Sequence, residues 1–338
     1  ILQYLGKYIR YGGRTDAARA WLEEKVGAPP IYEPDFVTLS FMGDMMLDRG
    51  VESSVIKNFG SDYSALFLNV SPKFLKNADI AFANLEGTAS NQGVDQKNLY
   101  SFRMDPEVVP ALAGAGFDVL SLANNHVGDW QRVAYTDTLA RLKENEIHYT
   151  GGGNTEAEAE TPVIIEKYGK KIGFLGFSDV GPTWLEANGE KAGLLLASDP
   201  RFEEIIMTAA NKVDFLIVSF HCGDEYKTTH NARQENLAHR AVDNGAKIVI
   251  GHHPHVAQDT EVYSRKDCTQ SSCASFIAYS LGNFIFDQKF STATMQGMLL
   301  QVKLWKDGTM DVKKNTTYLN SVFQLDRILE GKEEKLKF

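Results

Sequence analysis

Six short apolar runs alternate with longer amphipathic stretches along most of this chain, and this alternation constrains its fold more than any other feature. The runs are residues 36–42, 80–83, 118–122, 172–177, 215–220 and 248–250. Short apolar runs are typical of strands that are buried on both faces. The stretches between them predict helices at residues 64–77, 106–115, 132–144, 200–211 and 232–244. Strands and helices that alternate in this order predict right-handed crossovers and a mainly parallel sheet of the α/β class.

The C-terminal third has a different pattern. Residues 276–281, 298–305 and 310–318 are predicted to be strands, with a hairpin signal at Lys306-Asp307-Gly308. We therefore expect antiparallel strands to complete the architecture. The sequence shows no linker after residue 36, so residues 36–338 are expected to form one domain. Residues 1–35 predict a separate N-terminal helical arm, for which a juxtamembrane spacer is the alternative.

Charge and cysteine content narrow the class of protein. The chain has 338 residues and a net charge of −9, whereas a nucleic-acid-binding surface is basic, so we expect no nucleic-acid partner. Cys268 and Cys273 lie five residues apart in a polar insertion. They are expected to form a disulfide, which suits an oxidising compartment, or else to be two unpaired thiols. Cys222 is expected to serve packing.

Polar residues of the kinds that bind metal ions gather directly after the predicted strands. Five of the eight histidines lie there with one aspartate, one glutamate and one asparagine: His126, His221, His252, His253, His255, Asp44, Glu86 and Asn125. In an open α/β sheet, ligands bind in the crevice beyond the carboxyl ends of the strands. The pattern therefore predicts one site assembled from several strands, and its side chains suit divalent metal ions.

The segment from Gly251 to His255, which reads GHHPH, is the most specific of these strings. A residue before proline prefers extended backbone, so Pro254 predicts that His253 is extended. In such a segment His253 and His255 would project to the same side, as residues i and i+2 of a strand do, and would ligate one metal centre. His252 is expected to point away and to support the site or the fold.

Other residues beside these strings have predicted roles. An asparagine oxygen such as that of Asn125 can ligate a metal, and the adjacent His126 can act as a general acid. Asn124 is expected to share hydrogen-bond partners with them, because buried polar groups are costly when unsatisfied. Arg49, on the loop after Asp44, is predicted either to hold an anionic substrate group or to form an ordinary ion pair.

The remaining polar candidates carry weaker signals. Glu225, four residues after His221, is a candidate for substrate binding. The triple glycine at residues 151–153 lacks the spacing and the lysine of a phosphate-binding loop, so a flexible turn is expected. Three histidines in polar surroundings are expected at the surface: His148, His230 and His239.

Six strings occur in a defined order: GDMMLDR, NLEG, LANNHVGD, SFHCGDEY, GHHPHVAQ and SLGNFIFD. Together they resemble the CapA family of poly-γ-glutamate capsule biosynthesis proteins, which have a metallophosphatase-like (calcineurin-like) fold. The resemblance covers residues 36–302. It implies a four-layer αββα sandwich with mixed sheets and a metal site at one edge.

The resemblance also implies roles for individual residues. His126 matches the histidine that assists the leaving group, and Asn283 matches a further motif and is a candidate for substrate binding. The implied cofactor is one or two divalent ions of Mn, Fe or Zn. By the same similarity, the metal ligands would be Asp44, Glu86, Asn125, His221, His253 and His255.

The chain departs from the metallophosphatase pattern in three places. The first motif of metallophosphatases has the form Asp-x-His, whereas this chain has Asp44-Met45-Met46 and so lacks one ligand. Glu86 stands where an aspartate usually bridges two metals. Cys222 stands where the CapA pattern often has tryptophan, a change expected to affect packing or the pocket wall. The first two departures put a full dinuclear centre in doubt.

Two functions are therefore expected as alternatives. The first is a metal-dependent hydrolase in poly-γ-glutamate biosynthesis, with His126 and Arg49 in catalysis. The second is a non-catalytic surface protein that binds an anionic polymer and assists its assembly or export. The expected partners are an anionic polymer or phosphoester and membrane-bound capsule synthesis proteins. The resemblance implies an extracytoplasmic location, with anchoring to the outer face of the bacterial membrane by a segment outside this sequence.

Overall fold

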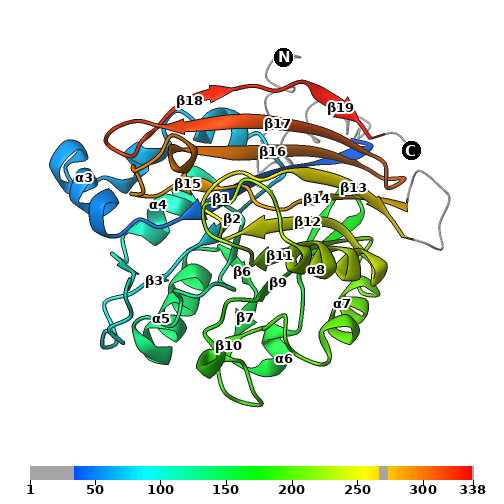
Figure 1. The fold of residues 1–338 in the computed structure, drawn as a ribbon, viewed down its shortest axis with the longest axis horizontal. Helices are drawn as coiled ribbons and strands as arrows, with labels where there is room; N and C mark the ends of the chain where they lie inside the picture. Colours follow the sequence, from blue (N-terminus) through cyan, green and yellow to red (C-terminus); the bar gives the residue numbers. More distant parts are fainter. Residues whose placement is uncertain (1–33, 266–272, 337–338) are drawn as a thin grey trace, which may run out of the picture. The chain divides into compact units, whose positions relative to one another are not determined.

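Two β-sheets packed face to face form the centre of a computed structural model that describes residues 34–265 and 273–336 (Figure 1). The first sheet has the strand order β18-β17-β16-β1-β2-β5-β6, with β15 beside β1 and β19 beside β17. Its strands β1, β2, β5 and β6 are parallel, whereas β16, β17 and β18 add antiparallel pairs. The bounds are β1 Phe36–Met45, β2 Ile80–Leu85, β5 Val119–Ser121, β6 His148–Thr150, β15 Asn283–Ile285, β16 Gln296–Trp305, β17 Met310–Leu319, β18 Leu325–Leu329 and β19 Glu333–Lys335.

The second sheet has the strand order β13-β14-β12-β11-β9-β8. Its four inner strands are parallel, and an antiparallel strand lies at each edge. The bounds are β8 Val163–Lys167, β9 Lys170–Ser178, β11 Phe215–His221, β12 Ala246–His252, β13 Thr260–Ser264 and β14 Ala274–Ala278. Parallel inner strands and antiparallel additions from the C-terminal third both match the sequence prediction.

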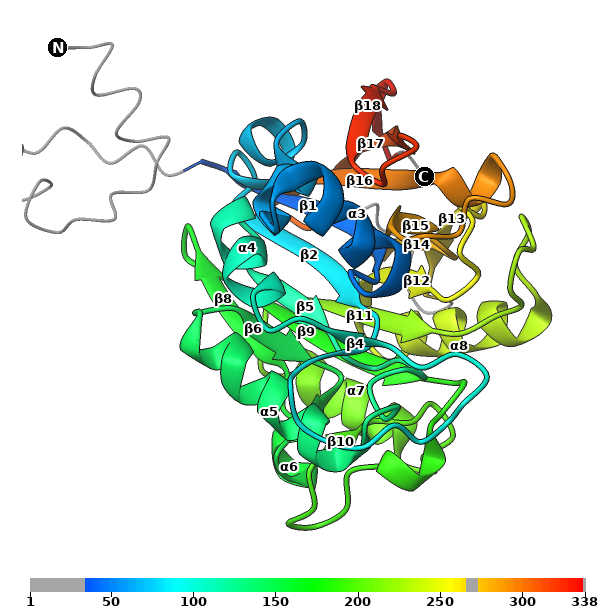
Figure 2. The same ribbon diagram turned by 90° about the vertical axis from the view of Figure 1, so that its left-hand side faces the viewer.

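The sheets and the helices outside them form stacked layers (Figure 1, Figure 2). Three apolar clusters lie between these layers. The middle cluster joins the sheets, where Phe82 of β2 and Phe174 of β9 stack with ring centroids 5.7 Å apart. Helices α3 (Arg49–Phe59), α4 (Val108–Ala115) and α5 (Gln131–Glu144) pack on the outer face of the first sheet. Helices α7 (Phe202–Ala210) and α8 (Ala232–Asp243) pack on the outer face of the second. The expected four-layer αββα sandwich is confirmed.

Short elements complete the described chain. Two pairs of two-residue strands lie outside the main sheets. These elements are β3 Thr88–Ala89, β4 Arg103–Met104, β7 Gly152–Gly153, α6 Glu156–Ala159, η3 Thr183–Leu185, β10 Gly193–Leu194 and η5 Ala293–Met295. Among the helices that the structure describes, none is both long enough and apolar enough to cross a bilayer.

The helix predicted at residues 64–77 is wrong. A 3₁₀-helix, η1 (Tyr63–Phe67), and a π-helix, η2 (Ser71–Leu75), replace it. Pro72 has no N–H, and its ring clashes with the carbonyl group four residues earlier, so a single α-helix cannot run through this stretch. Helix α3 was not predicted, although Asp48 caps its first turn and Gly60 ends it in the left-handed conformation.

The flexible turn predicted at the triple glycine is also wrong. Gly152 and Gly153 form the buried strand β7, which pairs with β10. A Cβ atom at Gly152 would lie 2.0 Å from the hydroxyl oxygen of Tyr135, which donates a hydrogen bond to the Gly193 carbonyl. Glycine is therefore required here by close packing rather than by flexibility.

A capping box fixes the start of α8. The Asn231 side chain accepts a hydrogen bond from the Gln234 N–H, and the Gln234 side chain accepts one from the Asn231 N–H. We expect Asn231→Ala to lower the free energy of unfolding by about 1 kcal/mol in urea denaturation. Asn236→Ala, at an exposed position inside the same helix, is the control and should cost little, because alanine has the higher helix propensity. Equal losses in the two variants would contradict the capping role.

The cysteines and the N-terminal arm can be placed only in part. Cys222 is a buried free thiol in the apolar cluster under α8, which fits its predicted packing role. Cys273 is disulfide-bonded, and its predicted partner Cys268 lies outside the described residues. The predicted arm at residues 1–35 lies almost wholly outside them too. The described residues from Phe36 onward form one compact unit.

Candidate metal centre

The carboxyl ends of strands from both sheets meet at one place. Asp44 of β1 is in register with Asn84 of β2, and His221 of β11 is in register with His252 of β12. The segment that carries Asn283 approaches β1 closely, since the Asp44 N–H donates to the Gly282 carbonyl at 2.9 Å. A Cβ atom at position 43 would lie 1.8 Å from that carbonyl oxygen, so the approach requires Gly43. The predicted assembly of strand ends is therefore present.

Asp44 is the fully buried hub of this cluster. It accepts hydrogen bonds from Asn84 Nδ2 at 2.9 Å and from the His253 N–H at 3.1 Å. His252 Nδ1 lies 3.1 Å and His255 Nδ1 3.6 Å from its oxygens. Burial opposes ionisation, but the contact with His252 and the neighbouring imidazoles outweigh it and hold the pKa of Asp44 below its usual range. The carboxylate is therefore charged at neutral pH.

Glu86 follows β2 and is also fully buried. Its Oε1 has no hydrogen-bond partner and lies 3.7 Å from His255 Nε2 and 4.0 Å from His126 Nε2. Burial, followed by the charge of Asp44, raises the pKa of Glu86 well above its usual value. A buried carboxylate oxygen without a donor costs free energy. A cation would supply the missing partner, so the residue fits a role as a metal ligand.

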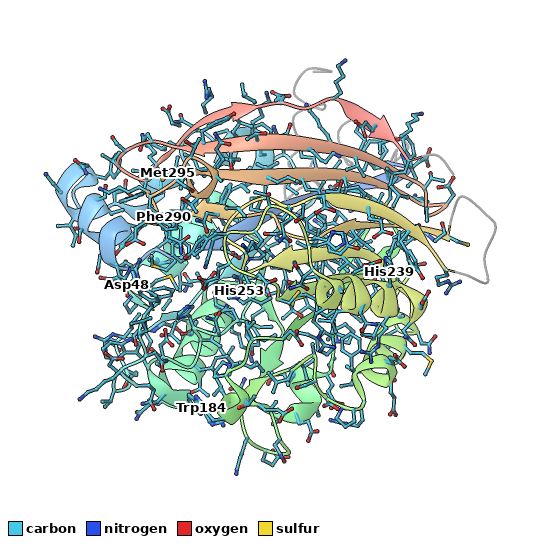
Figure 3. The ribbon with its side chains drawn as sticks, viewed as in Figure 1. Asp48, Trp184, His239, His253, Phe290 and Met295 are labelled. Atoms are coloured by element: carbon cyan, nitrogen blue, oxygen red, sulfur yellow. The ribbon has the colours of Figure 1, made fainter. Side chains whose placement is uncertain are left out.

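The backbone of the GHHPH segment differs from the prediction. His253 has φ +97° and His255 has φ +59°, so both are left-handed rather than extended. The two rings nevertheless lie together, with centroids 6.0 Å apart, and His253 Nδ1 is buried without a partner. His253 lies near the middle of the molecule in Figure 3. Left-handed backbone is strained for non-glycine residues, and such strain is found preferentially at functional sites.

His252 does not point away from the cluster, as was expected. It is buried with its Nδ1 beside Asp44 and its ring centroid 6.1 Å from that of Phe82 in the core between the sheets. Because β12 continues through His252, strand alternation directs this side chain toward the first sheet.

Burial lowers the pKa values of three histidines in the cluster. The pKa of His255 falls to about 4, and those of His221 and His253 also lie below the usual range. Neutral imidazoles bind metals, so these side chains are in the state that a ligand needs at neutral pH. His221 is further held by Asn125 Oδ1, which lies 2.9 Å from its Nε2.

His126 lies at the edge of the cluster and is partly exposed. Its Nδ1 is 2.7 Å from Asp129 Oδ2, and its ring lies against Phe102 with centroids 4.0 Å apart. A carboxylate can only accept, so Nδ1 carries the hydrogen and Nε2 is directed toward Glu86 at 4.0 Å. This geometry suits transfer of a proton at Nε2.

The predicted substrate-binding residues lie around the cluster. Asn283 is buried, and its Oδ1 lies 3.0 Å from His255 Nδ1, which makes it a support for a candidate ligand. Arg49 forms a two-point ion pair with Asp287, the second of the two roles considered for it. Its guanidinium also lies over the ring of Phe102 at 4.9 Å. Glu225 is exposed at the cluster's edge.

Within the part of the chain that the structure describes, two groups of side chains each place potential ligand atoms within 4.8 Å of one another. The deep group is Asp44, Glu86 and His221, all buried, and the outer group is Glu225, His253 and His255. Each mixes carboxylate and imidazole, which suits Mn, Fe or Zn. Asn125, the other predicted ligand, lies beside the deep group, with its Oδ1 2.9 Å from His221 Nε2. Met46, which stands where the metallophosphatase motif has a histidine, packs with Phe102 and Phe286.

Sequence reasoning missed two residues that organise this centre. Asn84 contacts the whole deep group, and Asp129 orients His126. The signal for Asp129 was its position three residues after His126 in the string NNHVGD. A polar residue inside the apolar run before Glu86 was the signal for Asn84.

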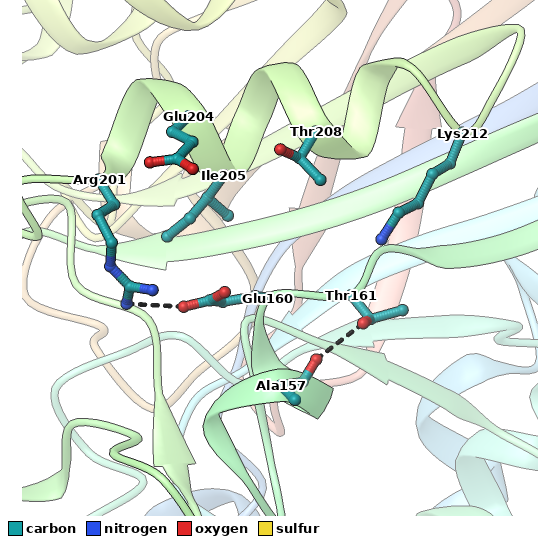
Figure 4. Close-up of a pocket in the computed structure, with 8 residues that line it drawn as sticks. All are labelled: Ala157, Glu160, Thr161, Arg201, Glu204, Ile205, Thr208 and Lys212. Atoms are coloured by element: carbon teal, nitrogen blue, oxygen red, sulfur yellow. Dashed lines mark hydrogen bonds and ion pairs between the residues drawn. The ribbon is translucent and has the colours of Figure 1, made fainter.

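A separate surface pocket lies between α6 and α7 (Figure 4). Arg201 pairs there with Glu160, and the lining contains none of the candidate metal ligands. It is therefore not part of the centre described above.

Comparisons with known proteins place the chain in a family. The sequence model of the bacterial capsule synthesis protein family PGA_cap matches residues 38–288. The chain is 34% identical over 304 residues to the capsule biosynthesis protein CapA of Bacillus anthracis, covering 86% of this chain and 70% of that protein. It is 34% identical over 282 residues to the PGA biosynthesis protein CapA of Bacillus subtilis (strain 168), covering 82% and 70%. The chain therefore belongs to the PGA_cap family, and the predicted CapA resemblance is confirmed.

Similarity to solved structures is more distant. The NAD nucleotidase of Haemophilus influenzae shares 12% identity at a TM-score of 0.47, over 90% of this chain and 54% of that one. A 5′-nucleotidase precursor from Thermus thermophilus shares 13% identity at a TM-score of 0.41, over 88% and 54%.

Proposed function

We propose that this protein is a metal-dependent hydrolase that acts in the biosynthesis of a bacterial capsule or cell-envelope polymer of the poly-γ-glutamate type. The observation that carries the proposal is the pair of buried, unpartnered ligand atoms, Glu86 Oε1 and His253 Nδ1, beside the oriented imidazole of His126. Buried polar atoms normally have a partner, and a divalent cation would supply one to both of these ligand atoms. A bound divalent ion would polarise a phosphoryl or acyl oxygen and lower the pKa of a bound water toward neutrality.

The protein's own residues have separate tasks in this proposal. Glu86, His253 and His255 hold the cation, and Asn283 orients His255 through its Nδ1. Asp129 accepts a hydrogen bond from Nδ1–H of His126, so that in the protonated imidazolium Nε2–H faces the cluster and gives its proton to the leaving group, which leaves the ring neutral. The apolar contacts of His126 and Met46 with Phe102 limit water at this wall of the site.

The biological setting of the proposal comes from the family. The relatives named above are capsule and PGA biosynthesis proteins, so an anionic polymer and membrane-bound synthesis proteins are the proposed partners. An extracytoplasmic location, with anchoring at the outer face of the membrane, is part of the proposal. The disulfide at Cys273 supports that location, because disulfides persist in oxidising compartments.

Metal removal tests the proposed function. We expect protein purified without a histidine tag to contain bound Mn, Fe or Zn, and to hydrolyse a generic phosphomonoester, a phosphodiester or poly-γ-glutamate. A chelator should abolish turnover and added Mn²⁺ should restore it, because the cation activates the attacking water. Metal content is measured by elemental analysis, and turnover by product release.

The other outcomes of this experiment also discriminate. Bound metal without turnover on any of these substrates would favour the non-catalytic polymer-binding function. Protein that neither retains nor takes up metal would overturn the assignment of the centre.

A further inference from the structure

The amide of Asn84 sits inside the deep group of candidate ligands. Its Nδ2 is 2.9 Å from Asp44 Oδ1, 3.4 Å from His221 Nδ1 and 3.5 Å from Glu86 Oε2. These are the same three residues that would hold a cation there. Asn84 is fully buried, so no water competes for these contacts.

The orientation of this amide is fixed by its neighbours. The backbone N–H of His126 can only donate, and it donates to Asn124 Oδ1 at 3.1 Å. Asn124 Nδ2 must then be the atom that donates to the Leu85 carbonyl at 2.8 Å and to Asn84 Oδ1 at 3.0 Å. The oxygen of Asn84 is therefore engaged, and its nitrogen is the atom turned into the deep group. An amide nitrogen has no lone pair to offer a metal, so Asn84 in this orientation is not a ligand.

The two groups of candidate ligands differ in whether their atoms have hydrogen-bond partners. In the deep group, Asp44 has donors from Asn84 and from the His253 N–H, and His221 has Asn84 and Asn125 as partners. Glu86 belongs to the deep group but reaches both: its Oε2 lies near Asn84, whereas its orphaned Oε1 is directed to His255 of the outer group. In the outer group, His253 Nδ1 also has no partner. The unpartnered ligand atoms therefore face the outer group, whereas Asp44 and His221 of the deep group already have hydrogen-bond partners.

We propose that this chain binds a single divalent cation, held by His253, His255, Glu225 and Glu86 Oε1, and that the Asn84 amide permanently replaces a second cation in the deep group. The inference rests on the proposed metal-dependent function and deepens it, because it states how many cations the centre binds and which residues hold them. The Asn84 amide stabilises the Asp44 carboxylate by donating a hydrogen bond to it. A cation in the deep group would stabilise the same carboxylate, but it would add positive charge.

Glu225 gives the single site an open side. It is exposed, whereas His253 and His255 are buried. The loop that carries it is held by the Tyr226 N–H, which donates to the Pro254 carbonyl at 2.8 Å, and by Gln258, which donates to the Lys227 carbonyl at 2.9 Å. Arg49, for which the sequence predicted binding of an anionic substrate group as one of two roles, is paired with Asp287. An anionic substrate group would therefore meet the cation on the Glu225 side.

Cation stoichiometry tests this inference independently of turnover. Calorimetric titration of the metal-free protein with Mn²⁺ should reach saturation at about one ion per chain. The electron paramagnetic resonance spectrum of the bound Mn²⁺ should be that of isolated ions. Two ions per chain with an exchange-coupled spectrum would overturn the inference and leave the proposed hydrolase intact. No binding of Mn²⁺ would overturn both.

Variants of the two groups give a second readout. Asn84→Asp should add a second binding event and the coupled spectrum, because the donor becomes a carboxylate ligand. Where that variant does not fold, Asn84→Ser removes the amide and should also admit a second ion. Glu225→Gln should weaken binding of the single ion about tenfold or more. Asp224→Asn removes the same charge from the adjacent residue, whose carboxylate binds Asn231, and should leave affinity unchanged.

The comparison of these variants tests which residues hold the cation. Equal weakening by Glu225→Gln and Asp224→Asn would mean that general charge, not ligation, is responsible, and would overturn the role of Glu225. A stoichiometry that stays at about one ion in both Asn84 variants would overturn the role of Asn84.

Discussion

Glu86→Gln is expected to weaken divalent-cation binding about 100-fold or more and to leave the metal-free protein at least as stable as the wild type near pH 8. Loss of an outer-shell partner already costs about 10–100-fold in affinity, and Glu86 is a direct candidate ligand. Its carboxyl group is fully buried beside Asp44, and Oε1 has no donor. Glutamine keeps the shape and the contact with Asn84 but removes a charge that the metal-free fold disfavours.

The pH dependence of folding stability follows from the direction in which the pKa of Glu86 is shifted. Burial and Asp44 raise the pKa of Glu86 well above its unfolded value. The protonated form therefore stabilises the folded state fully below the unfolded pKa of about 4.5, and this stability is lost as pH rises through the folded pKa. The buried histidines act oppositely, since their neutral forms favour folding as pH rises to about 6.5. The comparison at each pH is therefore between wild type and variant.

The measurement is urea denaturation in chelator at several values between pH 5 and pH 8, with Mn²⁺ titration beside it. The stability difference should move in favour of the variant as pH rises. Glu52→Gln is a matched control, because burial and Asp48 also raise the pKa of Glu52, in α3 and outside the centre. It should leave cation affinity unchanged. Unchanged affinity in Glu86→Gln, or marked destabilisation of its metal-free form at pH 8, would contradict the assignment.

The position of the centre was predictable because strand ends in a parallel sheet share one edge. Asp44, Glu86, His221 and His253 each follow an apolar run, and the alternation of runs and helices placed those ends together. Knowledge of the individual strand bounds was not needed. The apolar runs ended a few residues early, since β1 continues through Met45 and β12 through His252. This extension is why His252 packs against Asp44 rather than away from it.

The geometry inside the centre was not predictable from local rules. Proline favours an extended residue before it, yet His253 is left-handed. The His253 N–H donates to Asp44, a residue 209 positions away, so a tertiary contact accompanies the departure from the local preference. The role of Asn84 likewise depends on Asn124 and on the backbone of His126, which lie far from it in the sequence. Such contacts appear only when the strands are assembled.

His126→Ala is expected to lower kcat by about 100- to 10,000-fold on phosphoesters while metal content stays unchanged. His126 Nε2 is 4.0 Å from Glu86 Oε1, and Asp129 holds its other nitrogen at 2.7 Å. The side chain therefore borders the cation site without being one of the proposed ligands. The readouts are steady-state kinetics and elemental analysis of the same preparation, and the fold is checked by its urea midpoint.

The dependence on the leaving group separates general-acid catalysis from a structural role. A poor leaving group, such as an alkyl alcohol, needs a proton as its bond to phosphorus breaks, whereas 4-nitrophenolate does not. The loss in His126→Ala should therefore be much larger for an alkyl ester than for a 4-nitrophenyl ester, and the limb of the pH–rate profile that reports the acid should disappear. His239→Ala, which removes an imidazole paired with Glu261 outside the centre, should change neither readout. Equal losses on both esters would mean that His126 only shapes the site, because a group that delivers a proton cannot be equally important to a leaving group that requires none.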